Sequence, residues 1–88
     1  MKIKKGFMLR KIQNTAVVVP FGADSVDFNN IMNLNETGAF IWSKLESDTT
    51  EDAVVKALTS QYDIDEISAK TDVAEFIEML RKNGLIEE

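Results

Sequence analysis

The chain has 88 residues, of which 44% are hydrophobic and 28% charged, and its formal net charge is −5. One proline and four glycines exclude a linker or a low-complexity segment, so residues 1–88 are expected to form a single globular domain. The chain contains no cysteine and no histidine, which excludes a disulfide framework and removes the thiolate, the usual general base and the commonest metal ligand.

The N-terminal part of the chain predicts a β-hairpin. Residues Phe7 to Gln13 suit a half-exposed strand, and Asn14 suits a tight turn because asparagine tolerates a positive φ. The run Thr15 to Val19 is mostly β-branched, and Pro20 should end the second strand because proline has no N–H to donate.

A third strand is expected after a loop at residues 22–27. It covers Phe28 to Leu34, and its two consecutive asparagines, Asn29 and Asn30, give it a low strand propensity. The three strands together predict an antiparallel sheet in the first 34 residues.

The first helix should begin at Glu36. Asn35 is a good N-cap, and Glu36 places negative charge at the positive end of the helix dipole. The apolar run Ala39 to Trp42, followed by Leu45, indicates that this helix is buried on more than one side and forms the centre of the core.

Two further helices complete the domain. Thr49 and Asp52 have the spacing of a capping box, which predicts the start of the second helix. The apolar positions of that helix are Val54, Ala57, Leu58 and Tyr62.

The third helix is expected from Ile67 to Asn83. Gly84 suits the left-handed position after a helix, and Leu85 can then close over Leu80, as in a Schellman ending. The strand Leu85-Ile86 is expected to lie along the hairpin. The third helix has a core-facing stripe at Val73, Phe76, Ile77 and Leu80. The predicted fold class is therefore α+β and winged-helix-like, with a three-stranded antiparallel N-terminal sheet followed by a three-helix bundle.

Charge is distributed unevenly along the chain. The first 23 residues carry five basic side chains and no acid, whereas the remainder carries five basic and fifteen acidic side chains. Two interpretations stay open: a basic hairpin that packs against an acidic helical body, or an electrostatic field that steers a charged peptide. No segment suits a secretion signal or a membrane-spanning helix, which predicts a cytoplasmic protein.

The stretch Gly22 to Asp27 resembles the turn that carries the modified serine of acyl carrier proteins, here Ser25. That fold requires a helix on each side of the serine, whereas Pro20 precedes it and two asparagines follow it. A strand-connecting turn is the preferred interpretation, and an acyl-carrier-like protein modified at Ser25 is a lesser alternative.

A winged-helix DNA-binding or regulatory protein is the main alternative to a peptide-binding domain. On the third helix, the charges of Lys70, Arg81 and Lys82 are balanced by three acids. Because attraction to phosphate dominates DNA affinity, a neutral helix on an acidic chain disfavours binding to nucleic acid. The remaining carboxylate pairs are interpreted as solvated surface charge, which predicts a protein with no catalytic residues, no metal and no cofactor.

The sequence resembles the family of coenzyme PQQ synthesis protein D (PqqD) over essentially its whole length. The most specific part is Leu34-Asn-x-Thr-Gly-Ala-x-Ile-Trp42. The other stretches that carry the resemblance are Asp27 to Asn33, Thr50-Glu-Asp-Ala53, Asp72-Val73, Phe76, Leu80 and Gly84-Leu-Ile86.

The resemblance implies a RiPP recognition element, a small non-catalytic domain that captures the leader of a ribosomally made precursor peptide and delivers it to a radical SAM maturase. In that family the leader adds as a strand to the third strand and lies against the third helix, a mode in which main-chain hydrogen bonds give affinity and side-chain pockets give specificity. The implied peptide-binding residues of the strand are Phe28, Asn29, Asn30, Ile31, Met32, Asn33 and Leu34. Those of the helix are Val73, Ala74, Ile77, Glu78 and Arg81, where Val73 and Ile77 also suit the core. The precursor, the maturase, PQQ itself as the product, and a monomer or a dimer are left open.

Overall fold

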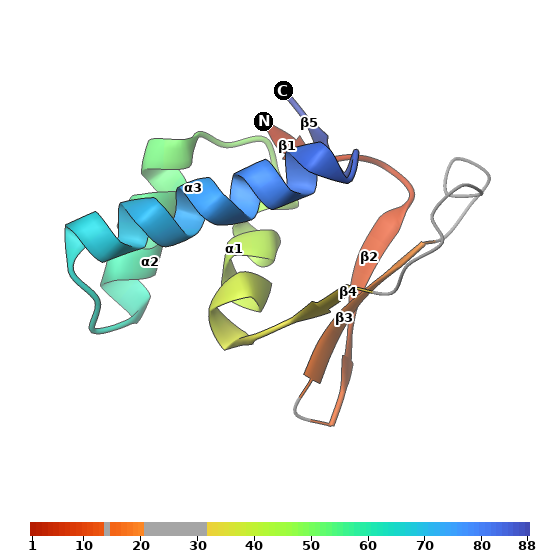
Figure 1. Ribbon diagram of the computed structural model, residues 1–88, viewed down its shortest axis with the longest axis horizontal. Coiled ribbons are helices and arrows are strands. Elements are labelled where there is room, and N and C mark those ends of the chain that lie inside the picture. The colour runs from red at the N-terminus through yellow and green to blue at the C-terminus, as the bar shows by residue number, and fades with distance from the viewer. Residues whose placement is uncertain (14, 21–31) are drawn as a thin grey trace.

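The computed structural model describes residues 1–13, 15–20 and 32–88 (Figure 1). The three helices gather on one side of the molecule, and the hairpin of β2 and β3 projects away from them. The elements in chain order are β1 (Lys2–Ile3), β2 (Phe7–Ile12), β3 (Thr15–Pro20), β4 (Met32–Leu34), α1 (Glu36–Leu45), α2 (Glu51–Gln61), α3 (Glu66–Lys82) and β5 (Ile86–Glu87).

The larger sheet is antiparallel and has the order β2-β3-β4. Leu9 lies opposite Val18, which in turn lies opposite Met32, so these side chains share the sheet face that is turned toward the helices. The predicted hairpin is confirmed. The positive φ of its turn lies at Gln13, at 58°, while Asn14 is outside the described residues.

A second sheet of two strands joins the ends of the chain, which lie side by side in Figure 1. Ile3 of β1 pairs with Ile86 of β5, and the backbone N–H of Lys4 donates to the carbonyl of Leu85 at 2.8 Å. The prediction that the C-terminal strand lies along the hairpin is therefore wrong. Two-residue strands are too short to carry a hydrophobic period, so their partner depends on where tertiary packing brings the chain ends.

Helix α1 begins where the sequence predicted. The Oδ1 atom of Asn35 accepts a hydrogen bond of 2.7 Å from the backbone N–H of Gly38. Helix α2, in contrast, is capped by Thr50 and not by the predicted Thr49, because the Thr50 Oγ1 atom accepts from the N–H of Ala53 at 3.2 Å. The backbone N–H of Thr49 instead donates to the carbonyl of Met1 at 2.9 Å, a long-range contact that no local pattern reveals.

Both ends of α3 are capped. The Asp65 carboxylate accepts from the N–H of Ser68 at 2.7 Å, which starts the helix one residue before the expected Ile67. At the other end Gly84 has a φ of 69°, and the N–H of Leu85 donates to the carbonyl of Leu80 at 2.9 Å. The predicted Schellman ending is confirmed.

The core lies between the helices and the inner face of the larger sheet. Trp42 is 1% exposed, which confirms that it occupies the centre of the core. The other buried members of the core are Ala16, Val18, Leu34, Ile41, Leu45, Val54, Val55, Leu58, Ala69, Val73, Ile77, Leu80 and Leu85. The α+β fold class, with one three-stranded antiparallel sheet and three helices, is confirmed. Within the described ranges no helix combines the length and the hydropathy needed to cross a membrane.

Candidate functional site

Strand β4 forms one edge of the larger sheet. It pairs with β3 through Val17 opposite Asn33 and Val18 opposite Met32, and no described strand pairs with its other side. Three of the seven predicted strand residues, Met32, Asn33 and Leu34, therefore belong to an edge strand. The other four, Phe28, Asn29, Asn30 and Ile31, lie outside the described residues.

The side chains of β4 alternate between the two faces of the sheet. Leu34 is buried against the core and Met32 is partly buried, whereas Asn33 is exposed on the opposite face. An added strand would meet the unpaired backbone of β4 at its edge, since the side chains of an antiparallel sheet stand above and below that plane.

Helix α3 comes close to the C-terminal end of β4 through Phe76. A Cβ atom on Gly38 would lie 3.2 Å from Cε1 of Phe76 and 3.5 Å from Cβ of Leu34, so Gly38 gives room for close packing at this corner. Asp72, Glu75 and Phe76 from α3 line a pocket of about 330 Å³ together with residues 35, 37, 38 and 41 around the start of α1. The pocket joins the end of β4 to one flank of α3.

The five predicted residues of α3 do not gather in this pocket. Val73 and Ile77 are buried in the core, at 0% and 1% exposure. Because a helix turns about 100° per residue, Asp72 and Phe76 lie on one flank of this buried stripe, and Arg81 lies on the opposite flank.

The flank of Arg81 also carries Ala74 and Glu78, and all three side chains are exposed. Arg81 is held by two ion pairs, to Glu78 at 2.6 Å and to Glu88 at 2.7 Å. These hydrogen bonds raise the pKa of Arg81 and, from the other side, the Arg81 guanidinium lowers the pKa of Glu88. Arg81 therefore connects α3 to the C-terminal segment.

Sequence reasoning assigned Phe76 to the core and interpreted Glu75, together with Glu78, as solvated surface charge. Phe76 is partly buried, packing on the core with part of its ring while lining the pocket. The sequence could have indicated this role, because Phe76 lies at the margin of the buried stripe, next to the acids at 72 and 75. What the sequence lacked was the direction from which β4 approaches the helix.

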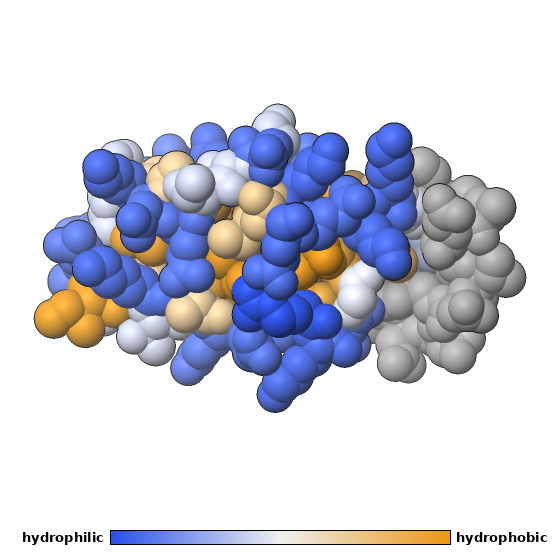
Figure 2. All heavy atoms as spheres, turned by 90° about the horizontal axis from the view of Figure 1, so that it is seen from above, coloured by the Kyte–Doolittle hydropathy of each residue, from blue (hydrophilic) through white to orange (hydrophobic). Residues whose placement is uncertain are grey.

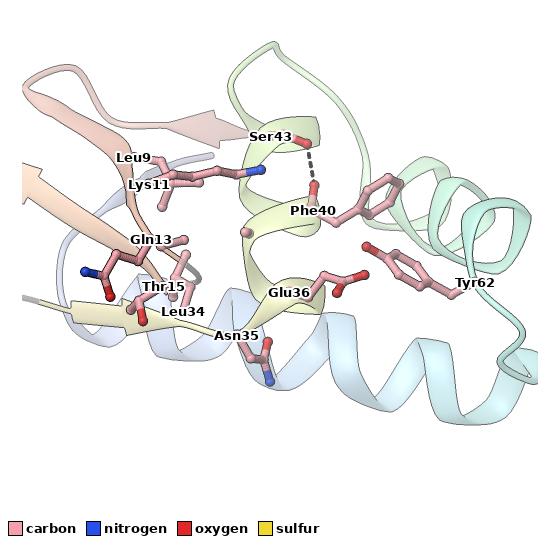
Figure 3. A pocket seen from close by; sticks show the side chains of 12 residues that line it. Leu9, Lys11, Gln13, Thr15, Leu34, Asn35, Glu36, Phe40, Ser43 and Tyr62 are labelled. Carbon is pink, nitrogen blue, oxygen red and sulfur yellow. Dashed lines mark hydrogen bonds between the residues drawn. The ribbon is translucent and has the colours of Figure 1, made fainter.

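A larger pocket, of about 680 Å³, lies between the inner face of the sheet and α1 (Figure 3). Its apolar surface comes from Leu9 and Leu34 of the sheet and Phe40 of α1, and Lys11 of β2 lies at its wall. Its other lining residues are Gln13, Thr15, Ala16, Asn35, Glu36, Ala39, Ser43 and Tyr62.

Tyr62 closes one side of the larger pocket. Its ring meets Phe40 edge-on at a centroid distance of 5.4 Å, and Figure 3 shows its hydroxyl turned toward Glu36. Desolvation raises the pKa of Tyr62, and the Glu36 carboxylate raises it further, so the phenol stays protonated at neutral pH.

Three described carboxyl groups have a shifted pKa, and in each the pKa is lowered. The carboxyl groups of Asp48, Asp65 and Glu88 have pKa values lowered by hydrogen bonds from the N-terminal amino group, from Ser68 and from Arg81, respectively. Hydrogen bonds of this kind hold a carboxylate ionised, whereas a general acid needs a raised pKa. In the part of the chain that the structure describes, no group of three or more acidic side chains is arranged to hold a metal ion.

Comparison with solved structures identifies two similar folds. The chain of "TbiB1 in Complex with the TbiA(beta) Leader Peptide" has a TM-score of 0.80 and 24% identity, with 99% of this chain and 95% of that chain covered. The chain of "Lasso peptide synthetase B1 complexed with the leader peptide" has a TM-score of 0.77 and 21% identity, with 99% and 96% covered. At these identities the similarity establishes the fold.

The sequence comparisons give a narrower result. No curated protein matches the chain. The family model described as coenzyme PQQ synthesis protein D matches residues 15–86, which include both β4 and α3. The chain therefore belongs to the coenzyme PQQ synthesis protein D (PqqD) family.

Proposed function

We propose that this chain is a non-catalytic module that binds the leader of a ribosomally made precursor peptide and presents it to a modifying enzyme. The leader adds as a strand to the open side of β4, within the region 28–34. A radical SAM maturase is the enzyme class that the PqqD family implies. Binding takes place in the cytoplasm, where the ribosome releases the precursor.

The observation that carries this proposal is the unpaired side of β4 next to the pocket at Phe76. An extended peptide can satisfy the free N–H and C=O groups of an edge strand, and pockets beside the edge can select alternate side chains. Strand β4 is only three residues long and contains a weak strand former, Asn33, and no described strand occupies its outer side.

The two similar structures support the same function. Their names describe complexes with leader peptides, and their fold matches this chain over 99% of its length. We therefore transfer the class of ligand from those proteins to this chain, and the open edge of β4 supports strand addition as the mode of binding.

We further propose that α3 contributes the flank of Asp72 and Phe76. The ring of Phe76 offers an apolar contact to a peptide side chain, and Asp72 is exposed beside it. Arg81, which the sequence placed in the groove, lies on the opposite flank and is occupied by Glu78 and Glu88.

Hydrogen exchange tests the proposal directly. A synthetic peptide with the leader sequence of a candidate precursor should slow amide exchange in Asn29 to Asn33 and leave the amides of α2 unchanged. Protection confined to the basic segment Lys2 to Lys11 would contradict strand addition at β4 and assign the peptide to that segment.

Two α3 variants identify the flank that the peptide contacts. Phe76→Leu, which keeps most of the packing against Leu34, should weaken leader binding roughly tenfold, the equivalent of 1.4 kcal/mol. Arg81→Glu should leave affinity nearly unchanged, and any effect it has should shrink with salt because the side chain is exposed. If Arg81→Glu loses leader binding and Phe76→Leu does not, the peptide contacts the flank of Ala74, Glu78 and Arg81 instead.

A further inference from the structure

Strand β2 is the second edge of the larger sheet, opposite β4. It pairs with β3 from Phe7 opposite Pro20 to Ile12 opposite Thr15, and no described strand lies along its other side. The small sheet of β1 and β5 is separate from it. The molecule therefore has two open strand edges, and the proposed leader occupies one of them.

The outer face of β2 exposes apolar side chains. Met8 is 42% exposed and Ile12 is 58% exposed, and with Ile67 at the far end of the molecule they are the large hydrophobic residues most exposed among those described. Arg10 lies between them on the same face. Large exposed hydrophobic side chains beside an open edge indicate a contact surface more than a solvated one.

The inner face of β2 also has a role, because it borders the larger pocket. Leu9 and Lys11 line that pocket, and the Lys11 side chain extends across it in Figure 3. A strand added to β2 would place alternate side chains on the outer face and at the mouth of this pocket.

Among the described residues, four cations of this segment have no ion pair with an acid. The ion pairs of the described residues are Met1 with Asp48, Lys70 with Glu66, and Arg81 with Glu78 and Glu88. None involves Lys4, Lys5, Arg10 or Lys11, all of which are exposed. The interpretation that a basic hairpin packs against the acidic helices is therefore not supported by these four side chains, and their charge is available to a partner.

We propose that the outer edge of β2 from Met8 to Ile12 is a second docking edge, which takes an acidic strand-forming segment of a partner protein. The residues of β2 specify the chemistry of that segment in antiparallel register. From its N-terminus to its C-terminus, the partner segment places an apolar residue opposite Ile12, acids opposite Lys11 and Arg10, and apolar residues opposite Leu9 and Met8. A sequence that meets this pattern is Val-Glu-Glu-Val-Val. This inference uses an edge other than the leader's and does not depend on the proposed function.

Other occupants fit this edge less well. Full antiparallel pairing of β2 with β2 of a second copy would place Met8 opposite Lys11 and Leu9 opposite Arg10, which gives neither cation an acidic partner across the pair. Arg10 and Lys11 point to opposite faces of the strand, so they do not form the single basic surface that a nucleic acid backbone requires. Cations on an edge strand can serve only to prevent aggregation, but such protection does not require exposed Met8 and Ile12 beside them.

The test uses the full chain labelled with ¹⁵N and two matched peptides, acetyl-Thr-Val-Glu-Glu-Val-Val-Thr-amide and its counterpart with lysine in place of glutamate. The acidic peptide should shift the amide signals of Met8 to Ile12, leave those of α3 unchanged, and bind more weakly as salt is raised. The lysine peptide should not shift them. Saturation of the β4 edge with a leader peptide should leave the acidic peptide bound.

Variants of β2 distinguish the contribution of its charges to peptide binding from that of its apolar contacts. The double variant R10E/K11E should lose the acidic peptide by roughly tenfold or more and gain affinity for the lysine peptide. Ile12→Thr keeps the charge and the strand propensity, and should weaken the acidic peptide through the loss of apolar contact alone. Lys56→Glu, at an exposed position of α2 away from β2, is the matched control.

Several results would overturn the inference. These are equal shifts with both peptides, no shifts with either, shifts confined to β4 and α3, or equally strong shifts of Met8 to Ile12 with a single-stranded oligonucleotide. Self-association of the unliganded chain that is abolished by R10E/K11E would also overturn it, in favour of a second copy as the occupant.

Discussion

Trp42 shows how a single side chain organises this small domain. It is fully surrounded by the core, and no described residue gives its Nε1 atom a hydrogen-bond partner. An unpaired buried N–H lowers stability, so the contribution of this residue comes from the apolar area of its ring.

We predict that Trp42→Ala lowers the free energy of unfolding by about 3 to 5 kcal/mol, because it removes a large buried side chain and leaves a cavity. A domain whose total stability is ~5 to 15 kcal/mol would then be close to unfolding. Urea denaturation followed by circular dichroism measures the effect. Ile67→Ala, at a residue that is 80% exposed, is the control that should change little. An unchanged melting temperature for Trp42→Ala would place the ring outside the core.

Asp65 gives a pH-dependent prediction. Its pKa is lowered from the ordinary value of 3.8, first by the hydrogen bond from the backbone N–H of Ser68 and then by the Ser68 hydroxyl. A carboxyl group with a depressed pKa in the folded state stabilises the fold at every pH above its unfolded pKa, and this stabilisation is lost as pH falls through the folded pKa. The stabilisation of α3 by the Asp65 carboxylate should therefore be present above about pH 3.8 and be lost as the pH falls below that value.

The measurement is an NMR titration of the Asp65 carboxyl together with urea unfolding at acidic pH. Asp65→Asn keeps an oxygen that can cap α3 but cannot titrate, so this contribution to the pH dependence should disappear. A titration midpoint at or above 3.8 would contradict the assigned cap.

At the scale of elements, the ends of the helices were determined by local chemistry. Asn35, Asp65 and Gly84 act within a few residues of their own positions, through hydrogen bonds that the residue type and spacing predict. The start of α2 was predicted one residue early because the N-terminal segment, distant in sequence, binds the backbone at Thr49.

We predict that Gly84→Ala destabilises the protein by about 1 kcal/mol, because alanine has a Cβ atom that disfavours a φ of 69°. No atom lies within 4 Å of the position that this Cβ would occupy, so the cost comes from the backbone and not from a clash. Gly84→Asn should cost less, since asparagine tolerates this conformation. Chemical denaturation distinguishes the two, and equal stability of all three proteins would contradict the argument.

Proline substitutions in β4 test strand addition. In an antiparallel strand consecutive N–H groups point to opposite sides, so Met32→Pro and Asn33→Pro remove one donor that faces β3 and one that faces outward. The variant that loses the outward donor should keep its melting temperature and lose leader binding. The other variant, which loses the donor that faces β3, should lose stability as well as leader binding. If both bind the leader as the unmodified chain does, the peptide does not add to β4 at these residues.

At the scale of the whole molecule, the face seen from above is mainly hydrophilic where it is coloured, and hydrophobic atoms appear between charged groups and at one end of the view (Figure 2). The binding surfaces proposed here are the two edges of one three-stranded sheet, so a leader at β4 and a partner at β2 would not compete for the same strand.

We predict that the purified chain alone leaves a precursor peptide chemically unchanged. The sequence has no histidine and no cysteine, and its described carboxyl groups with a shifted pKa are held ionised. Mass spectrometry of the precursor after incubation, with and without the modifying enzyme, is the measurement. A mass change that requires only this chain would overturn the assignment as a binding module.

The sequence by itself determined the fold class and the centre of the core. The hairpin, the cap at Asn35, the burial of Trp42 and the Schellman ending at Gly84 follow from alternation, side-chain capping and backbone preference, which act over a few neighbouring residues. The same patterns, with the motif from Leu34 to Trp42, were sufficient to recognise the family.

The tertiary structure decided which flank of α3 lies beside β4. A helical sequence gives the buried stripe of Val73 and Ile77 but is symmetric about it, so it cannot tell whether Phe76 or Arg81 lies beside the strand. The pairing of β1 with β5 and the ion pairs of Arg81 were likewise decided by the meeting of distant segments. Such contacts depend on the direction in which elements approach each other, and no local period encodes that direction.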